Sequence, residues 1–276
     1  MSAPQILPPG RIRDFRRRIY LHYRRNGRDL PWRKITDPYR IIVSEIMLQQ
    51  TQVDRVMEKY NRFLDRFPDP ASLAAAGLDQ VLSIWQGLGY NRRARCLWLA
   101  AQTIEQEHGG IVPQTPEALA TLPGIGGATA ASITAFAFNK PVVFIETNIR
   151  TVFIHEFFPR KKPVRDEEIR PLVAQTLDRR NPRRWYNALM DYGVMLKKQH
   201  GNASRRSAHH NKQSPFEGST RQVRGAIIRL LLQNPRISRA RIVDATGHSP
   251  ARVGSMLDAL LKDKMITKRQ GRYAIA

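Results

Sequence analysis

The sequence predicts an all-α main body followed by a smaller C-terminal domain. Apolar residues recur at helical spacing along most of the 276 residues, and few segments show the alternation typical of strands. A polar and basic stretch from Lys197 to Gly218 interrupts this pattern before it resumes. The length also exceeds the ~100–150 residues of a common single domain. We therefore expect two domains joined by a basic linker.

The helices of the main body are indicated by apolar periodicity and by their end signals. Thr115 is a favourable N-cap residue, and Pro116 suits the first position of a helix. The helical pattern breaks at residues 140–145 and then restarts. The expected helices cover residues 11–25, 39–50, 92–107, 147–158, 165–177 and 184–198, with a short one opening at residue 70.

The C-terminal part has a pattern of its own. Three helices are expected at residues 220–233, 238–246 and 249–262, followed by a hairpin at 265–275 with Gln270-Gly271 at its turn. This order is typical of a winged helix-turn-helix domain, which we place at residues 219–276. Residues 211–276 hold 13 Lys and Arg against 4 Asp and Glu, which favours DNA binding. A protein-binding winged helix is the alternative.

The overall charge indicates a polyanionic partner. Lys and Arg number 46 against 23 Asp and Glu, a formal net charge of +23. No apolar stretch approaches the roughly 20 residues of a membrane span, and residues 1–10 lack the apolar core of a signal peptide. Cys96, the single cysteine, cannot form an internal disulfide or a cysteine-based metal cluster. We expect a cytoplasmic, nucleoid-associated protein without a membrane partner.

A glycine-rich turn at residues 122–127 lies between two expected helices. Its glycines permit a tight turn and close approach to a partner. Exposed backbone N–H groups and the start of the next helix form a natural phosphate site. We therefore predict that Gly124, Gly126 and Thr129 contact DNA phosphates. A simple connector between helices is the alternative for such a turn taken alone.

Four motifs in fixed order place this turn in a known context. They are Leu30-Pro31-Trp32-Arg33, Ser44-Glu45-Ile46-Met47-Leu48-Gln49-Gln50-Thr51, Gly87-Leu88-Gly89-Tyr90 and Leu122-Pro123-Gly124-Ile125-Gly126. From residue 30 to 196 the chain closely resembles the adenine DNA glycosylases, helix-hairpin-helix relatives of endonuclease III. The resemblance implies a two-lobed glycosylase domain at residues 1–210 with its active site between the lobes. Lobe A is 36–145, and lobe B combines 1–35 with 146–210.

Breaking an N-glycosidic bond requires an acid for the base and an anion near the sugar. Glu45 shares a helix face with Ile41 and Leu48, so partial desolvation favours its protonated form. The resemblance implies that Glu45 protonates the base; a Glu satisfied by a structural partner is the alternative. Glu146 begins a helix, where an ionised carboxylate is favoured and suits stabilisation of a cationic sugar.

The resemblance assigns further residues to the site. Relatives normally have Asp at position 146, so the longer Glu146 is either an adapted catalytic residue or a mark of altered activity. Asn148 matches a residue that helps to hold the site. The base pocket is implied at Leu30, Trp32, Arg33 and Asp191, and insertion into the duplex at Gln50 and Tyr90. Trp32 and Tyr90 also suit an aromatic core.

Three departures from the relatives change the expected chemistry. Ala128 stands where endonuclease III has the lysine that cuts the strand, so we expect a monofunctional enzyme without lyase activity. Lys197 stands at the first cysteine of the usual iron–sulfur cluster, so we expect no cluster; a monovalent cation at the hairpin stays open, and no other metal is expected. The basic loop 197–206 then offers phosphate contacts, and a winged helix replaces the large domain that senses 8-oxoguanine.

Three functions stay open at this stage. The first is excision of adenine opposite guanine or 8-oxoguanine. The second is excision of another base on the same fold, such as thymine or uracil opposite guanine, or a deaminated or oxidised base. The third is a non-catalytic DNA-binding protein, which Glu146 and the winged helix suggest and the intact Glu45 motif opposes. In each case we expect a monomer that binds double-stranded DNA with a lesion or mismatch.

Overall fold

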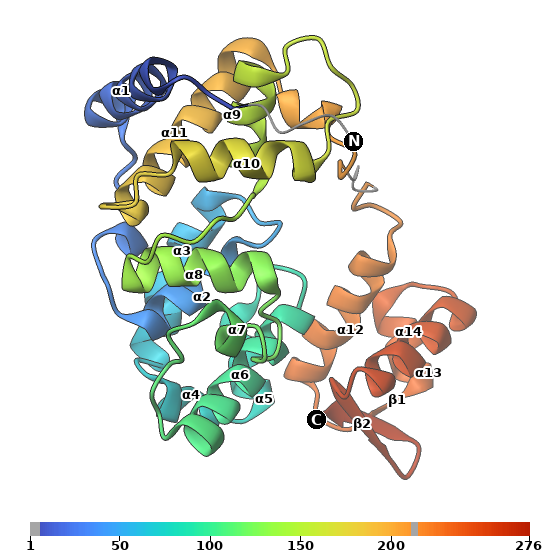
Figure 1. The fold of residues 1–276 in the computed structure, drawn as a ribbon. Helices are drawn as coiled ribbons and strands as arrows, with labels where there is room; N and C mark the ends of the chain where they lie inside the picture. Colours follow the sequence, from blue (N-terminus) through green and yellow to red (C-terminus); the bar gives the residue numbers. More distant parts are fainter. Residues whose placement is uncertain (1–5, 211–214) are drawn as a thin grey trace. The chain divides into compact units, whose positions relative to one another are not determined.

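The computed structural model describes residues 6–210 and 215–276 (Figure 1). Residues 1–5 of the N-terminal segment and 211–214 of the expected linker lie outside the described residues. Contacts divide the chain into two compact units. Unit 1 comprises Met1–Ile41, Gln114–Ala120 and Ile125–Lys212, and unit 2 comprises Ile42–Pro113, Thr121–Gly124 and Gln213–Ala276.

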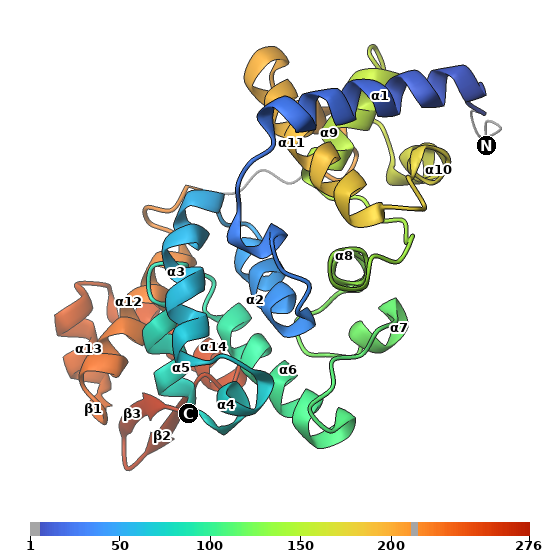
Figure 2. The same cartoon turned by 90° about the vertical axis from the view of Figure 1, so that its left-hand side faces the viewer.

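Unit 1 is built from helices that meet on aromatic side chains. Its elements are α1 (Pro9–Asn26), η1 (Pro31–Arg33), α7 (Pro116–Leu119), α8 (Gly127–Phe138), α9 (Thr147–Phe157), α10 (Asp166–Thr176), α11 (Pro182–His200) and η2 (Ala203–Arg206). Phe15 of α1 contacts Phe153 and Trp185 edge to face, with ring centroids 5.6 and 6.0 Å apart. These contacts join α1 to α9 and α11, which lie near one another in both views (Figures 1 and 2).

A glycine brings α9 and α11 close together. A Cβ on Gly193 would lie 2.6 Å from the backbone oxygen of Asn148, nearer than such atoms pack. The absence of a side chain at this position therefore allows the N-terminal turn of α9 to rest directly on α11. Both helices carry candidate site residues, so this packing fixes part of the site.

The helical part of unit 2 follows the same logic. It contains most of α2 (Pro38–Leu48) and all of α3 (Val53–Arg66), α4 (Pro70–Ala75), α5 (Leu78–Trp85) and α6 (Arg92–His108). Asp69 caps α4 by accepting a hydrogen bond from the backbone N–H of Ser72 at 2.8 Å. The indole of Trp98 donates to the backbone oxygen of Ala76 at 2.9 Å, which ties α6 to the end of α4.

The C-terminal elements form the expected winged helix-turn-helix. They are α12 (Thr220–Gln233), β1 (Ile237–Ser238), α13 (Arg239–Thr246), α14 (Pro250–Lys262), β2 (Ile266–Arg269) and β3 (Arg272–Ile275). The sheet order is β1-β3-β2, with Ile266 paired to Ile275 across the wing. Gln270 and Gly271 at the wing's turn have φ of 48° and 73°, as a tight hairpin requires. The predicted all-α body with a C-terminal winged helix is confirmed.

The segment 197–206, expected to be a basic loop, belongs to unit 1 and is mostly helical. Lys197 and Lys198 belong to α11, which extends to His200. Arg206 turns inward and donates to the backbone oxygens of Phe158 and Pro159 at 2.5 and 2.9 Å. Lys198 and Arg205 are exposed. The expected helix 184–198 already included Lys197 and Lys198, and the loop interpretation of the remaining residues missed the end of α11 and the short helix η2, which the hydrogen bonds of Arg206 hold in place.

Two helices of unit 2, α3 and α5, did not emerge from the sequence pattern. Every helix within the described residues falls short of the length and apolar character needed to cross a bilayer.

Candidate active site and DNA-contacting loops

The first cluster of site residues in unit 1 surrounds Asp191 on α11. Its Oδ2 and Oδ1 accept from the guanidinium of Arg33 at 2.7 and 2.8 Å. The backbone N–H of Arg28 and its Nε donate to the same carboxylate at 2.9 and 2.6 Å. The side chain of Asp191 is 2 % exposed and that of Arg33 is 8 % exposed. Two residues expected to line the base pocket therefore form a buried ion pair with each other.

The electrostatic balance at Asp191 favours the charged form. Burial by itself raises its pKa, but the hydrogen bonds and charges of Arg33 and Arg28 outweigh burial and leave the pKa below its ordinary value. Leu30 and Trp32, the other two residues expected at the pocket, lie between Arg28 and Arg33 in the sequence and are also buried. The segment 28–33 is thus anchored to α11 by one carboxylate.

The second cluster lies at the N-terminus of α9. Glu146 is the N-cap residue, and its Oε1 accepts from the backbone N–H groups of Asn148 and Ile149 at 2.7 and 2.8 Å. Its Oε2 accepts from the side-chain amide of Asn148 at 3.2 Å. The longer side chain thus still caps the helix, which fixes the carboxylate against the positive end of the helix dipole.

Lys197 extends this cluster, which the sequence did not indicate. Its Nζ donates to Oδ1 of Asn148 at 2.7 Å, so the amide of Asn148 bridges Lys197 and Glu146. Burial lowers the pKa of Lys197 below its ordinary value; the charge of Arg28 adds to this effect, and that of Glu146 opposes it. A residue expected to face phosphates instead supports the candidate catalytic carboxylate.

Glu45 lies on the part of α2 that belongs to unit 2. The residues around it on this helix, from Ile41 to Ser44 and at Ile46 and Met47, are all buried. Glu45 itself is half-buried. An acid in this position is shielded on the helix side and remains within reach of solvent, as a proton donor to a bound base requires.

Two loops of unit 2 carry the residues expected to enter the duplex. Gln50 and Tyr90 have φ of 54° and 47°, in the left-handed region that side chains rarely adopt. Such backbone strain persists where surrounding contacts enforce it, often at functional sites. Gln50 is exposed, and Tyr90 is half-buried. Tyr90 is therefore not among the buried aromatic residues of this unit, which include Phe63, Phe67 and Trp85.

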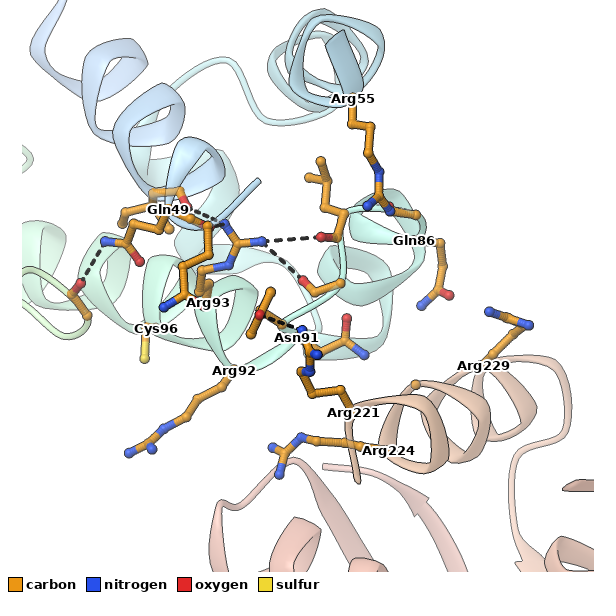
Figure 3. Close-up of a pocket in the computed structure, with 18 of the residues that line it drawn as sticks. Gln49, Arg55, Gln86, Asn91, Arg92, Arg93, Cys96, Arg221, Arg224 and Arg229 are labelled. Atoms are coloured by element: carbon orange, nitrogen blue, oxygen red, sulfur yellow. Dashed lines mark hydrogen bonds between the residues drawn. The ribbon is translucent and has the colours of Figure 1, made fainter. Parts of the chain in front are cut away.

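Arg93 holds both loops, a role that no sequence motif indicated. Its Nη1 donates to the backbone oxygens of Ile46 and Met47, each at 2.8 Å, and of Gln49 at 2.5 Å. Its Nη2 donates to the oxygen of Leu88 at 3.3 Å, and its guanidinium lies 5.3 Å from the ring centre of Tyr90 (Figure 3). Burial lowers the pKa of Arg93 to about 10, so it stays charged at neutral pH.

The hairpin has the glycine geometry that its motif predicts. Gly124 has φ of 81°, and a Cβ there would lie 2.5 Å from the Cβ of Cys96. Glycine is therefore required where the turn approaches α6. Gly126 is the N-cap of α8, and no atom lies within 4 Å of a Cβ built on it or on Gly127. The start of α8 is thus open to an anion, as the phosphate-site prediction requires.

Comparison with known proteins identifies the family. A model described as "HhH-GPD superfamily base excision DNA repair protein" matches residues 43–174. The chain is also 30% identical to adenine DNA glycosylase of Mycobacterium tuberculosis over 298 residues, covering all of this chain and 97% of the relative. The chain belongs to the HhH-GPD superfamily. It is a base excision repair DNA glycosylase.

Other relatives agree with this assignment. Adenine DNA glycosylase of Mycolicibacterium smegmatis is 31% identical over 282 residues, covering 90% of this chain and 92% of the relative. A solved thermostable thymine-DNA glycosylase superposes with a TM-score of 0.63 at 22% identity, covering 71% of this chain and 92% of that one. An endonuclease III–DNA intermediate gives 0.57 at 17% identity, covering 76% and 92%. At these identities the two structures support the fold alone.

The winged helix is matched separately. A model for winged helix-turn-helix DNA-binding domains covers residues 221–267.

The residues present do not fit the four-cysteine iron–sulfur cluster that the resemblance implies for most relatives. Lys197 occupies the first ligand position and binds Asn148, and Cys96, the single cysteine, lies on α6 against the hairpin. Within the described residues no group of three or more His, Cys, Asp or Glu side chains is placed to hold a metal.

Proposed function

We propose that this protein is a monofunctional adenine DNA glycosylase that removes adenine opposite guanine or 8-oxoguanine. The observation that carries the proposal is the match to adenine DNA glycosylases over the entire chain, at 30% identity. The motif around Glu45 supports it, because a non-catalytic DNA-binding protein has no need for a half-buried acid there. The reaction needs no cofactor; a monovalent cation at the hairpin remains an expectation.

In the proposed reaction Glu45 gives its proton to a ring nitrogen of the flipped adenine. The bond between the base and the sugar C1′ then breaks, and its electron pair leaves with the protonated base. The sugar becomes a cation, which the carboxylate of Glu146 stabilises by charge. Water adds to C1′ and releases a proton, and the products are free adenine and an abasic site.

The arrangement around Glu146 is suited to electrostatic stabilisation. Its carboxylate already accepts three N–H hydrogen bonds and is therefore fixed before the substrate binds. Catalytic charges that need no reorganisation during the reaction are the most effective ones. The bridge from Lys197 through Asn148 adds support from α11. We regard this cluster as the adaptation to the longer side chain at position 146.

The proposed absence of lyase activity depends on Ala128, which lies at the start of α8 and has no amine to form a Schiff base. An enzyme of this kind leaves the sugar-phosphate strand intact until alkali cleaves it.

Single-turnover base release from a panel of duplexes tests the proposal. The panel contains adenine opposite 8-oxoguanine and guanine, thymine and uracil opposite guanine, hypoxanthine, and oxidised pyrimidines. We expect release of adenine, strand breakage only after alkali, and a loss of about 10²–10⁴-fold in Glu45→Gln. Release of a different base would replace adenine as the substrate. Breakage without alkali would refute the monofunctional assignment, and tight binding without any release would refute catalysis.

A further inference from the structure

A cavity of about 740 Å³ opens in unit 2 between α12 of the winged helix and the loops that carry Gln50 and Tyr90 (Figure 3). Its size lies in the ~300–1,000 Å³ range of pockets that bind small organic ligands. The residues that line it from the glycosylase body include Gln49, Gln86 and Asn91. The others are Phe216, which precedes the winged helix, and Arg221, Arg224, Gly225, Arg229 and Asp263 within it.

The cavity carries a strong excess of positive charge. Arginines 55, 92, 93, 221, 224 and 229 line it, and Asp263 is the one acidic residue among the described lining residues. Asp263 pairs with Arg224 at 2.7 Å, so its charge is already balanced. Arg92 and Arg229 are exposed. Such a cavity is suited to an anionic ligand such as a nucleic-acid phosphate.

Aromatic surface accompanies this charge. Phe216 is a large apolar residue, yet it is 58 % exposed. Tyr90 receives a hydrogen bond of 2.7 Å from Arg221, whose guanidinium lies 5.5 Å from the ring centre. Aromatic rings next to arginines form the usual platform on which an unstacked base is held.

Gly225 gives the most specific indication that the cavity has a binding role. It lies inside α12, where glycine destabilises the helix relative to alanine. Packing does not demand it, since a Cβ built there has no atom within 4 Å. The spacing of 221, 225 and 229 puts it between two arginines on one face of the helix. The glycine therefore leaves open the middle of a basic wall.

The cavity is separate from the proposed chemistry. Glu45, Glu146 and Asp191 do not line it. A nucleotide held in this cavity would therefore be a different one from the nucleotide that is excised. When an enzyme flips one base out of a duplex, the opposing base loses its pairing partner and its hydrogen-bonding edge becomes accessible to the protein.

We propose that this cavity binds the nucleotide opposite the excised base, with its base against Phe216 and Tyr90 and its phosphate near Arg221 and Arg229. This inference rests on the proposed function to the extent that a base must be flipped. It gives α12, the first helix of the winged helix domain, a direct part in recognising the substrate.

A binding cycle tests the proposal with the full-length chain and two uncleavable duplexes. Probe 1 carries a tetrahydrofuran abasic analogue opposite guanine, and probe 2 carries the analogue on both strands at that position. The variants are Gly225→Leu, which places a side chain at a position that lines the cavity, and Ala226→Leu, which adds the same side chain at the adjacent position that does not line it. Fluorescence anisotropy gives each dissociation constant.

We expect Gly225→Leu to weaken binding of probe 1 about tenfold, the size of one stacked base, and to leave binding of probe 2 nearly unchanged. Ala226→Leu should affect neither probe. Phe216→Ala should reproduce the selective loss by removing an exposed side chain, which separates the effect from any misfolding of Gly225→Leu.

Other outcomes overturn the proposal. Equal losses on both probes would mean that the cavity contacts the backbone without taking a base, and no loss on either would mean that it binds no nucleotide. Because neither probe is cleaved, the result does not depend on base release. If no duplex releases a base but Gly225→Leu selectively weakens binding of probe 1, the proposed activity is rejected and this site is retained. If adenine is released but the variant has no selective effect, the activity is retained and this site is rejected.

Discussion

Arginine side chains serve different purposes in the two units of this protein. In unit 1, Arg28 and Arg33 surround the buried carboxylate of Asp191, and Arg150 forms two hydrogen bonds with Asp166 at 2.8 and 2.6 Å. In the cavity of unit 2, Arg92 and Arg229 are exposed. The local supply of protein acceptors distinguishes the two groups. Arginines with carboxylates to bind hold the fold, and we expect the exposed arginines of the cavity to be available to DNA phosphates.

This difference separates stability from affinity. A buried charge that loses its partner is strongly destabilising, because the remaining charge has neither water nor a counter-ion. An exposed arginine changes the free energy of unfolding little when it is replaced. The same residue at a DNA interface still contributes to affinity through the counterions that it displaces. Replacements in the two groups should therefore produce opposite patterns.

The largest expected effect is that of Asp191→Asn. The variant keeps the shape of the side chain but leaves Arg33, which is 8 % exposed, without its countercharge. We expect a loss of about 3–5 kcal/mol in the free energy of unfolding, measured by urea denaturation. Asp14→Asn is the matched control, because Asp14 pairs with Arg17 where both side chains are more than two-thirds exposed, at 71 and 79 %. An unchanged unfolding curve with slower base release would instead make Asp191 a base-reading residue.

The pH dependence of this loss follows from the direction of the shift. The folded-state pKa of Asp191 lies below its ordinary value, so its contribution to stability is present above the unfolded pKa of about 3.9. The contribution disappears as the pH falls through the folded pKa, where the carboxyl becomes protonated. The difference between wild type and Asp191→Asn should thus be constant from about pH 6 to 8 and shrink below about pH 4.

Arg93 sharpens the comparison because it lines the cavity yet resembles the structural arginines. Its guanidinium is occupied by backbone oxygens of two loops. Arg93→Met should cost about 1–3 kcal/mol of unfolding free energy, since these oxygens lose their donor. Arg92→Met, at the exposed neighbouring position in the same cavity, is the control and should leave the unfolding midpoint unchanged. Equal stability of the two variants would contradict the structural role of Arg93.

The sequence predicted the local structure where capping residues and apolar periodicity mark a helix clearly. Thr115 and Pro116 start a helix where the capping rule places it, and α12 occupies the expected residues 220–233. The helix α3 lacked such signals: its N-cap position is Gln52, whose side chain makes no capping hydrogen bond. The pattern of α3 is clear only once its buried face, which includes Val56, Tyr60 and Phe63, is known.

The site was predictable residue by residue but not as a set of contacts. The motifs pointed to Glu45, Glu146 and Asp191, yet no spacing rule indicates that Arg28 meets Asp191 from 163 positions away. The same holds for Lys197 and Asn148, which are 49 positions apart. A lysine in a basic segment suggests phosphate binding by composition alone. Its actual partner depends on the packing of α9 against α11, which Gly193 permits and which only the folded chain reveals.

The smallest effect on stability and the clearest effect on binding are expected for Arg229→Gln. The residue is exposed on α12 and lines the cavity. The unfolding free energy of the Arg229→Gln variant should stay within about 0.5 kcal/mol of wild type. Duplex affinity measured from low to high salt should lose about 0.9 from the slope of log K against log salt, the share of one phosphate contact. Arg17→Gln, an exposed arginine of α1 in unit 1, is the control and should keep the wild-type slope. A wild-type slope for Arg229→Gln would contradict the distinction between the two groups, because this exposed arginine would then contribute neither to stability nor to DNA binding.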